Sequence, residues 1–209
     1  KSVGNTAQIT RAMEAVSAVK MRKSQEFALK ARPYAIASLE MLKNILARTP
    51  TLPPFLSGRP VKTSLLLVVT SDKGLAGAFN SNVLKRAENW AEDRRRANQP
   101  FVLVTVGKKA REYFTRRLIP IQENFQDFGD HSKLQDTLPV AELILQGFLS
   151  EQWDEVEAVY THFRTTLKQE TVLHRILPAT REGIEEIVAA TLPEYGRFAE
   201  SPYTPNPTP

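Results

Sequence analysis

The sequence contains no cysteine, and this absence excludes disulfide bonds, cysteine-ligated zinc and thiol redox chemistry. A reducing compartment is therefore favoured. No apolar run approaches the roughly 18 residues that a membrane-spanning helix needs. The chain nevertheless has 209 residues, of which 42% are hydrophobic, so it can bury a sizeable core and intrinsic disorder is not expected.

Glycine is missing between Asn5 and Arg48, and this stretch has the periodicity of one long amphipathic helix, predicted over residues 1–48. Pro33 is its only breaker, and we expect it to kink or split the helix. At 1.5 Å per residue the helix is about 65–70 Å long and needs a partner along its length. Lys20 and Lys23 interrupt its apolar stripe, which consists of Ile9, Ala12, Met13, Val16, Phe27, Tyr34, Met41, Leu42 and Ile45.

The positive charge of the chain is concentrated in this helix. Residues 1–49 carry nine basic and three acidic side chains, a net charge of +6, whereas the remainder carries −1. A basic rod suits nucleic acid, an anionic membrane surface or an acidic protein. However, its only Phe and Tyr lie on the apolar stripe and its charges point in several directions, which disfavours a nucleic-acid binder. A rod surrounded by protein fits better than a merely solvated helix.

Prolines mark residues 49–61 as a linker, and residues 62–192 are predicted to form an α/β domain. Ser64–Thr70 and Phe101–Val106 are continuous apolar runs, typical of strands buried on both faces of a parallel sheet. Residues 155–164 and 170–177 alternate and predict a hairpin, so the sheet should be mixed. The fold class is therefore α/β, a long helix followed by a Rossmann-like domain. Residues 193–209 contain five prolines and should be irregular.

Two other segments of the domain are less regular. A short third strand is predicted around Leu118–Ile121, although Pro120 weakens it. A helix should follow, capped by Asp136 or Thr137, with Pro139 in its first turn. The apolar face predicted for this helix consists of Leu138, Ala141, Leu145, Phe148 and Leu149.

The turn Ser71–Gly77 (SDKGLAG) is the segment that most resembles a ligand-binding or catalytic motif. A phosphate loop needs a glycine-lysine-hydroxyl sequence after its glycines, but here Lys73 precedes them. The dinucleotide fingerprint also fails, because Gly74 and Gly77 supply two of its three glycines at the wrong spacing. A tight structural turn, built from Asp72, Lys73, Gly74 and Gly77, is favoured. A nucleotide- or phosphate-binding enzyme using Gly74–Gly77 is the alternative.

Metal and catalytic motifs are otherwise weak. His131, His162 and His174 are far apart in sequence, and only the last two could become neighbours, on the predicted hairpin. The nucleophile-elbow and zinc-protease motifs are both missing. We therefore expect no catalytic, cofactor-binding or metal-binding residues.

Two stretches resemble one family closely. Residues 5–25 (NTAQITRAMEAVSAVKMRKSQ), followed by ARPYA at residues 31–35, are similar to the N-terminal signature of the gamma subunit of F-type ATP synthase. Residues 70–83 (TSDKGLAGAFNSNV) resemble the second hallmark of that family, which follows the first strand of its α/β domain.

The resemblance implies a non-catalytic central rotor stalk that couples ion-driven rotation to the catalytic sites of the beta subunits, in ATP synthesis or hydrolysis. Its implied partners are the alpha and beta subunits, the epsilon subunit and the c-subunit ring, with no nucleic acid and no cofactor. The implied location is peripheral, on the cytoplasmic face of a bacterial plasma membrane. Thiol control, known for chloroplast forms, is not expected without cysteines.

The resemblance also assigns roles to the long helix. It would be one half of an antiparallel coiled coil whose seam is Ile9, Met13, Val16, Phe27, Tyr34 and Ile45. Lys20, Met21, Arg22 and Lys23 would contact the catalytic ring. Indexed at 100° per residue, Met21 falls about 120° from the seam and should point toward that ring. The C-terminal helix of the family is not found before Pro209, so we expect it to be truncated here or supplied by another chain.

Overall fold

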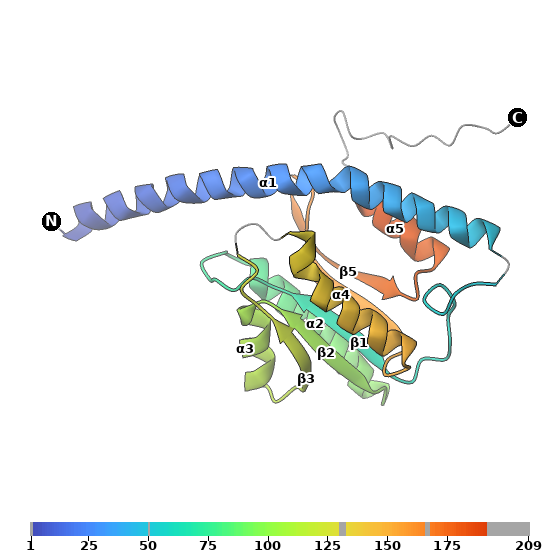
Figure 1. Ribbon diagram of the computed structural model, residues 1–209. Helices are drawn as coiled ribbons and strands as arrows, with labels where there is room; N and C mark the ends of the chain where they lie inside the picture. Colours follow the sequence, from blue (N-terminus) through green and yellow to red (C-terminus); the bar gives the residue numbers. More distant parts are fainter. Residues whose placement is uncertain (1, 50, 130–132, 166–167, 192–209) are drawn as a thin grey trace, which may run out of the picture.

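The computed structural model describes residues 2–49, 51–129, 133–165 and 168–191; the predicted tail and His131 lie outside them. A long helix runs along the α/β domain and projects beyond it at the N-terminal end (Figure 1). In chain order the elements are α1 (Ser2–Arg48), β1 (Ser64–Val69), α2 (Phe79–Arg96), β2 (Phe101–Val106), α3 (Lys108–Arg116), β3 (Ile121–Phe125), α4 (Leu134–Leu149), β4 (Glu155–Phe163), β5 (Gln169–Leu177) and α5 (Arg181–Thr191).

The five strands form one mixed sheet in the order β3-β2-β1-β4-β5. β1 pairs in parallel with both β2 and β4, and β2 pairs in parallel with β3. β4 and β5 form the predicted antiparallel hairpin at one edge. The predicted α/β class with a mixed sheet is therefore confirmed, and β1, the most continuous apolar run, lies at the centre of the sheet because it can be buried on both faces.

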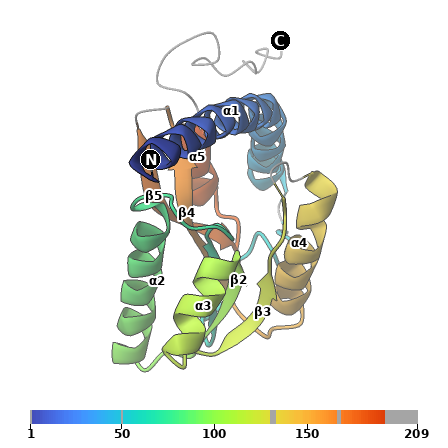
Figure 2. The same ribbon diagram turned by 90° about the vertical axis from the view of Figure 1, so that its left-hand side faces the viewer.

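Helices cover both faces of this sheet, with α2 and α3 on one side and α4 on the other (Figure 2). The alternation of β1 divides its side chains between two cores. Leu66 and Val68 pack among the buried residues of α2 and α3, and Leu65 and Leu67 pack against α4 and Trp153. Among the described residues, no helix has both the length and the apolar character needed to cross a bilayer.

Of the expected apolar face of α4, only Phe148 is confirmed as buried, and the other four residues are exposed. The buried side chains of α4 are Val140, Ile144 and Phe148, whereas the leucines of the predicted face are 42–53% exposed. α4 is apolar on two sides, so both sets follow the spacing of a helix, and contact with the sheet decides which set is buried. The exposed leucines are Leu138, Leu145 and Leu149.

Two element boundaries also differ from expectation. α4 begins a turn before the predicted cap, at Leu134, and the Asp136 carboxylate accepts the backbone N–H of Lys133 at 2.7 Å. Pro139 therefore lies inside the helix rather than in its first turn. The third strand begins at Ile121, where it was expected to end, because Pro120 has no N–H to donate to a strand ladder.

The Pro-rich segment after α1 is tied to the domain by a buried ion pair. Arg59 donates to the Asp154 carboxylate at 2.6 Å and to the backbone carbonyls of Phe148 and Trp153 at 2.7 Å each. The guanidinium also lies over the Phe148 ring, 4.4 Å from its centroid. This connection therefore holds a fixed path between α1 and β1.

Candidate functional site: the two faces of the long helix

α1 is one continuous helix of 47 residues that contains Pro33. We expected a kink or a split at this proline; the helix is not split, and Figure 1 shows a single ribbon with a gentle bend rather than a sharp kink. Pro33 still removes one backbone hydrogen bond, the one that its missing N–H would make to the carbonyl of Leu29. The helix is therefore intact but locally softer near its middle.

One face of α1 packs against the α/β domain. Ile36 is only 4% exposed, Arg32 donates through Nη2 to the backbone carbonyl of Phe163 at 2.8 Å, and Lys43 pairs with Glu185 of α5 at 3.1 Å. Arg32, Ile36 and Lys43 are four and seven residues apart, so they share one helix face, which we call the docking face. Burial lowers the pKa of the Arg32 guanidinium, which nevertheless remains protonated.

The docking face begins at Gln25, seven residues before Arg32. Every residue from Asn5 to Ser24 is exposed, whereas Gln25 is half-buried and its Nε2 is shielded from solvent. The helix therefore leaves the domain at Gln25, and the part that precedes it is about 35 Å long.

The predicted seam lies on the other side of α1. At 100° per residue its members fall about 200–260° from Arg32, so α5 and the sheet pack opposite to it. All its side chains are between 39% and 70% exposed. The seam thus remains a prediction with no partner among the described residues; its members are Ile9, Met13, Val16, Phe27, Tyr34 and Ile45.

The four residues predicted to contact a surrounding ring lie in the projecting part of the helix. Met21 is 49% exposed and falls about 20° from the direction of Arg32, on the side of the docking face and about 120° from the seam. Lys20, Arg22 and Lys23 are exposed as well, and Arg22 lies 3.5 Å from Glu26. Their exposure is compatible with a protein contact, but the described structure contains no partner that tests it.

The turn after β1 joins three parts of the domain. The Asp72 carboxylate accepts the backbone N–H of Lys108 at 2.8 Å and that of Asp127 at 3.0 Å. Asp72 therefore connects the carboxyl ends of β1, β2 and β3. At the tip of the turn, Leu75 and Gly77 have positive φ angles, and Leu75 is 99% exposed. These contacts give Asp72 a structural role, and the positive φ of Gly77 is a conformation that glycine adopts readily.

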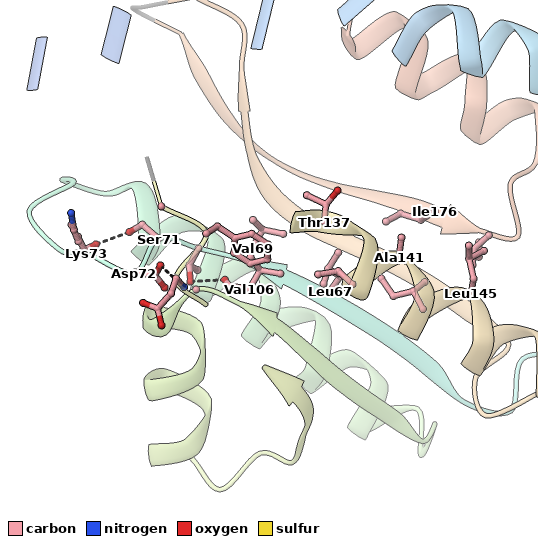
Figure 3. A pocket seen from close by; sticks show the side chains of 18 residues that line it. Leu67, Val69, Ser71, Asp72, Lys73, Val106, Thr137, Ala141, Leu145 and Ile176 are labelled. Carbon is pink, nitrogen blue, oxygen red and sulfur yellow. Dashed lines mark hydrogen bonds between the residues drawn. The ribbon is translucent and has the colours of Figure 1, made fainter. Parts of the chain in front are cut away.

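A cavity of about 1050 Å³ opens beside this turn, between the sheet and α4 (Figure 3). Its lining is largely aliphatic, with Val69 and Val106 from the sheet and Ala141 and Leu145 from α4. The side chain of Lys73 extends away from these groups in Figure 3. Gly74 and Gly77, on which the phosphate-binding alternative was based, are not among the lining residues.

The histidines of the hairpin do not form a metal site. In the β4–β5 register, His174 faces Ala158 and His162 faces Glu170, and Tyr160 lies between the two imidazoles. Within residues 2–49, 51–129, 133–165 and 168–191, no group of three or more candidate ligands could hold a metal ion.

Sequence reasoning found the exposed stripe but missed the docking face. The sequence pattern that could have revealed the docking face is the spacing of seven, four and seven residues through Gln25, Arg32, Ile36 and Lys43. Three of these four residues are polar, and hydrophobic periodicity alone passes over them.

Comparison with known proteins identifies the family. The family model described as ATP synthase matches residues 1–205. The ATP synthase gamma chain of Pelotomaculum thermopropionicum is 38% identical over 200 residues, covering 93% of this chain and 67% of the relative. That of Gloeothece citriformis is 36% identical over 188 residues, covering 88% of this chain and 60% of the relative.

A solved central stalk with c-ring, from the mitochondrial ATP synthase of Tetrahymena thermophila, has the same fold. It superimposes with a TM-score of 0.62 at 23% identity, covering 90% of this chain and 79% of that one. The chain spans about 60% of the length of the first curated relatives that it matches. These matches give no support to a phosphate-binding enzyme, and the chain belongs to the family of ATP synthase gamma chains.

Proposed function

We propose that this chain is the central rotor stalk of an F-type ATP synthase. In this role α1 is the shaft, and the α/β domain connects it to the ion-driven membrane ring. Rotation would change the conformation of the beta subunits, so the chain itself makes and breaks no bonds and needs no cofactor. Family membership supports this proposal, and so does the fold that the chain shares with a solved central stalk.

The observation that carries the proposal is the division of α1 into two faces. The docking face holds the helix to its own domain, and the seam on the other side leaves large apolar groups exposed. Exposed apolar stripes of this length mark sites of association. A second, antiparallel helix along the seam, Ile9 to Ile45, would complete a two-stranded coiled coil and stiffen the shaft.

The basic segment from Lys20 to Lys23 fits a contact with the alpha and beta subunits. Attraction between charges is long-ranged and weakly directional, so a basic shaft can meet acidic levers at several angles of rotation. Met21 lies about 120° from the seam and would face the ring. The epsilon subunit and the c-subunit ring would bind near the α/β domain. The protein would then lie peripherally at a membrane, and we infer the cytoplasmic face of a bacterial plasma membrane.

Co-assembly tests this function directly. The chain, continued through the C-terminal region that its relatives possess, is co-expressed with tagged alpha and beta subunits from the same source. We expect a stoichiometric complex that elutes as one species and hydrolyses ATP. Separate elution of the chain, with both helices folded by circular dichroism, would contradict the proposal.

A further inference from the structure

The β4–β5 hairpin extends out of the sheet toward α1. β1 pairs with β4 from Glu155 to Val159, whereas pairing between β4 and β5 continues to the Phe163–Gln169 pair. In Figure 1 the distal part of the hairpin reaches the middle of α1. Arg32 meets the hairpin there, at the last residue of β4.

The distal end of the hairpin is itself cross-linked. Glu170 of β5 accepts from Arg164 at 2.8 Å and lies 3.3 Å from the Lys168 ammonium. The backbone N–H of Arg164 donates to the carbonyl of Lys168 at 3.2 Å. These bonds hold β4 and β5 together beyond the part of β4 that pairs with β1, so the Phe163 carbonyl that accepts from Arg32 is held in a fixed position.

We propose that Arg32 is a positioning residue that braces the shaft against this hairpin and so fixes the direction in which α1 leaves the domain. Its neighbour Pro33 removes a helix hydrogen bond at the same level, so the backbone is softest where the brace acts. About 35 Å of helix projects beyond the docking face, and a small tilt here becomes a large displacement at the far end.

The spacing of the anchors gives the size of the effect. Arg32 and Lys43 are eleven residues, or about 16 Å, apart along the axis. Gln25 is only half-buried and its Nε2 has no hydrogen-bond partner among the described residues, so it is not counted as an anchor. Without Arg32 the remaining anchors, Ile36 and Lys43, are only about 10 Å apart. The tilt caused by a given displacement varies inversely with anchor separation, so the spread of shaft directions should widen by about 1.5-fold.

Because the chain lacks cysteine, two introduced thiols can report this spread. Ser17→Cys on the projecting part of α1 and Asn89→Cys on the exposed side of α2 carry spin labels, and pulsed dipolar spectroscopy measures the distribution of distances between them. Arg32→Met keeps the aliphatic stem and removes the donors, and should widen the distribution about 1.5-fold. Arg32→Lys keeps one donor and should give an intermediate width.

Lys30→Ala is the matched control, because it removes a positive charge two residues away on an exposed part of the same helix. Its distribution should equal that of the parent. A distribution in Arg32→Met as narrow as that in Lys30→Ala, with equal helicity, would overturn the proposal. If Arg32→Met does not fold, Arg32→Lys is used in its place. A distance distribution of Arg32→Lys that is as narrow as that of the parent would then overturn the proposal.

The consequence for coupling rests on the proposed stalk function. In the assembled, membrane-bound complex, Arg32→Met should retain ATP hydrolysis while ion pumping per ATP falls at least twofold, and Lys30→Ala should change neither. Unchanged pumping would contradict a coupling role. Failure of the parent chain to assemble would contradict the stalk function but not the role of Arg32, because the distance distributions are measured without the other subunits.

Discussion

Arg59 and Asp154 form a buried ion pair, with Nε and Oδ1 2.6 Å apart, that fastens the segment after α1 to the start of β4. The second carboxylate oxygen of Asp154 accepts the backbone N–H groups of Lys62 and Thr63 at 2.9 and 3.1 Å. The pair thus orients the chain as it enters β1.

Removing Arg59 should destabilise the protein strongly. The side chain of Asp154 is only 5% exposed, so Arg59→Ala leaves a buried carboxylate without its counter-ion, which costs about 3 kcal/mol. Urea unfolding at pH 7, followed by tryptophan fluorescence, measures this loss. Arg86→Ala, at an exposed arginine of α2, is the control and should change the free energy of unfolding by less than about 0.5 kcal/mol.

The Asp154 carboxyl should make stability depend on pH. Burial by itself raises its pKa, but hydrogen bonds from Thr63, Lys62 and Arg59, with the charge of Arg59, outweigh burial and lower the pKa. A depressed carboxyl pKa contributes stability above the pKa of the unfolded chain, about 3.9, and this contribution disappears as the pH falls through the folded pKa. The free energy of unfolding should therefore fall less between pH 5 and pH 3 in Asp154→Asn than in the parent; parallel profiles would contradict this assignment.

Gly147 of α4 lies against Trp153. A Cβ at this position would be 1.9 Å from Cζ2 of the indole, whose Nε1 donates to the carbonyl of Ile144 at 3.0 Å. Gly147→Ala gains about 1 kcal/mol of helix propensity but forces the indole to move, which costs about 1–3 kcal/mol of packing plus about 1 kcal/mol of hydrogen bonding. We expect net destabilisation of about 1–3 kcal/mol by urea unfolding.

Gly58→Ala is the comparison, because a Cβ there meets nothing within 4 Å. It should leave the urea midpoint almost unchanged. An equally stable Gly147→Ala variant, with an unaltered near-ultraviolet tryptophan spectrum, would show that the helix can accommodate the added methyl group.

The two central strands and the edge hairpin were predictable from sequence because local patterns determine them, whereas the order of the strands in the sheet was not. The run Ser64–Val69 is apolar on both faces, and a strand with that pattern belongs at the centre of a parallel sheet. The inward face of α4 was not predictable, because Leu145 and Ile144 belong to two competing stripes and only contact with the sheet decides between them.

The docking face was hidden for a related reason. Arg32 bonds to a backbone carbonyl 131 residues away, and any residue type at position 163 would supply the same acceptor. Asp72 likewise meets backbone N–H groups. Backbone partners are the same for every residue type, so the sequence does not show where they lie. The seam depends on apolar side chains, so its residues could be found from their helical spacing.

The last prediction concerns burial of the seam by a second helix. It is tested in the extended chain co-expressed with alpha and beta subunits. Val16→Glu places a charge on the seam, where a partner helix would bury it at a cost of several kcal/mol, so co-assembly should fall at least tenfold in a pull-down. Ala15→Glu adds the same charge to an exposed neighbouring position about 100° away and should assemble nearly as the parent does. Because both variants add the same charge to the same turn of the helix, a difference between them reports burial of the seam itself. Equal assembly of the two would mean that no helix covers this face.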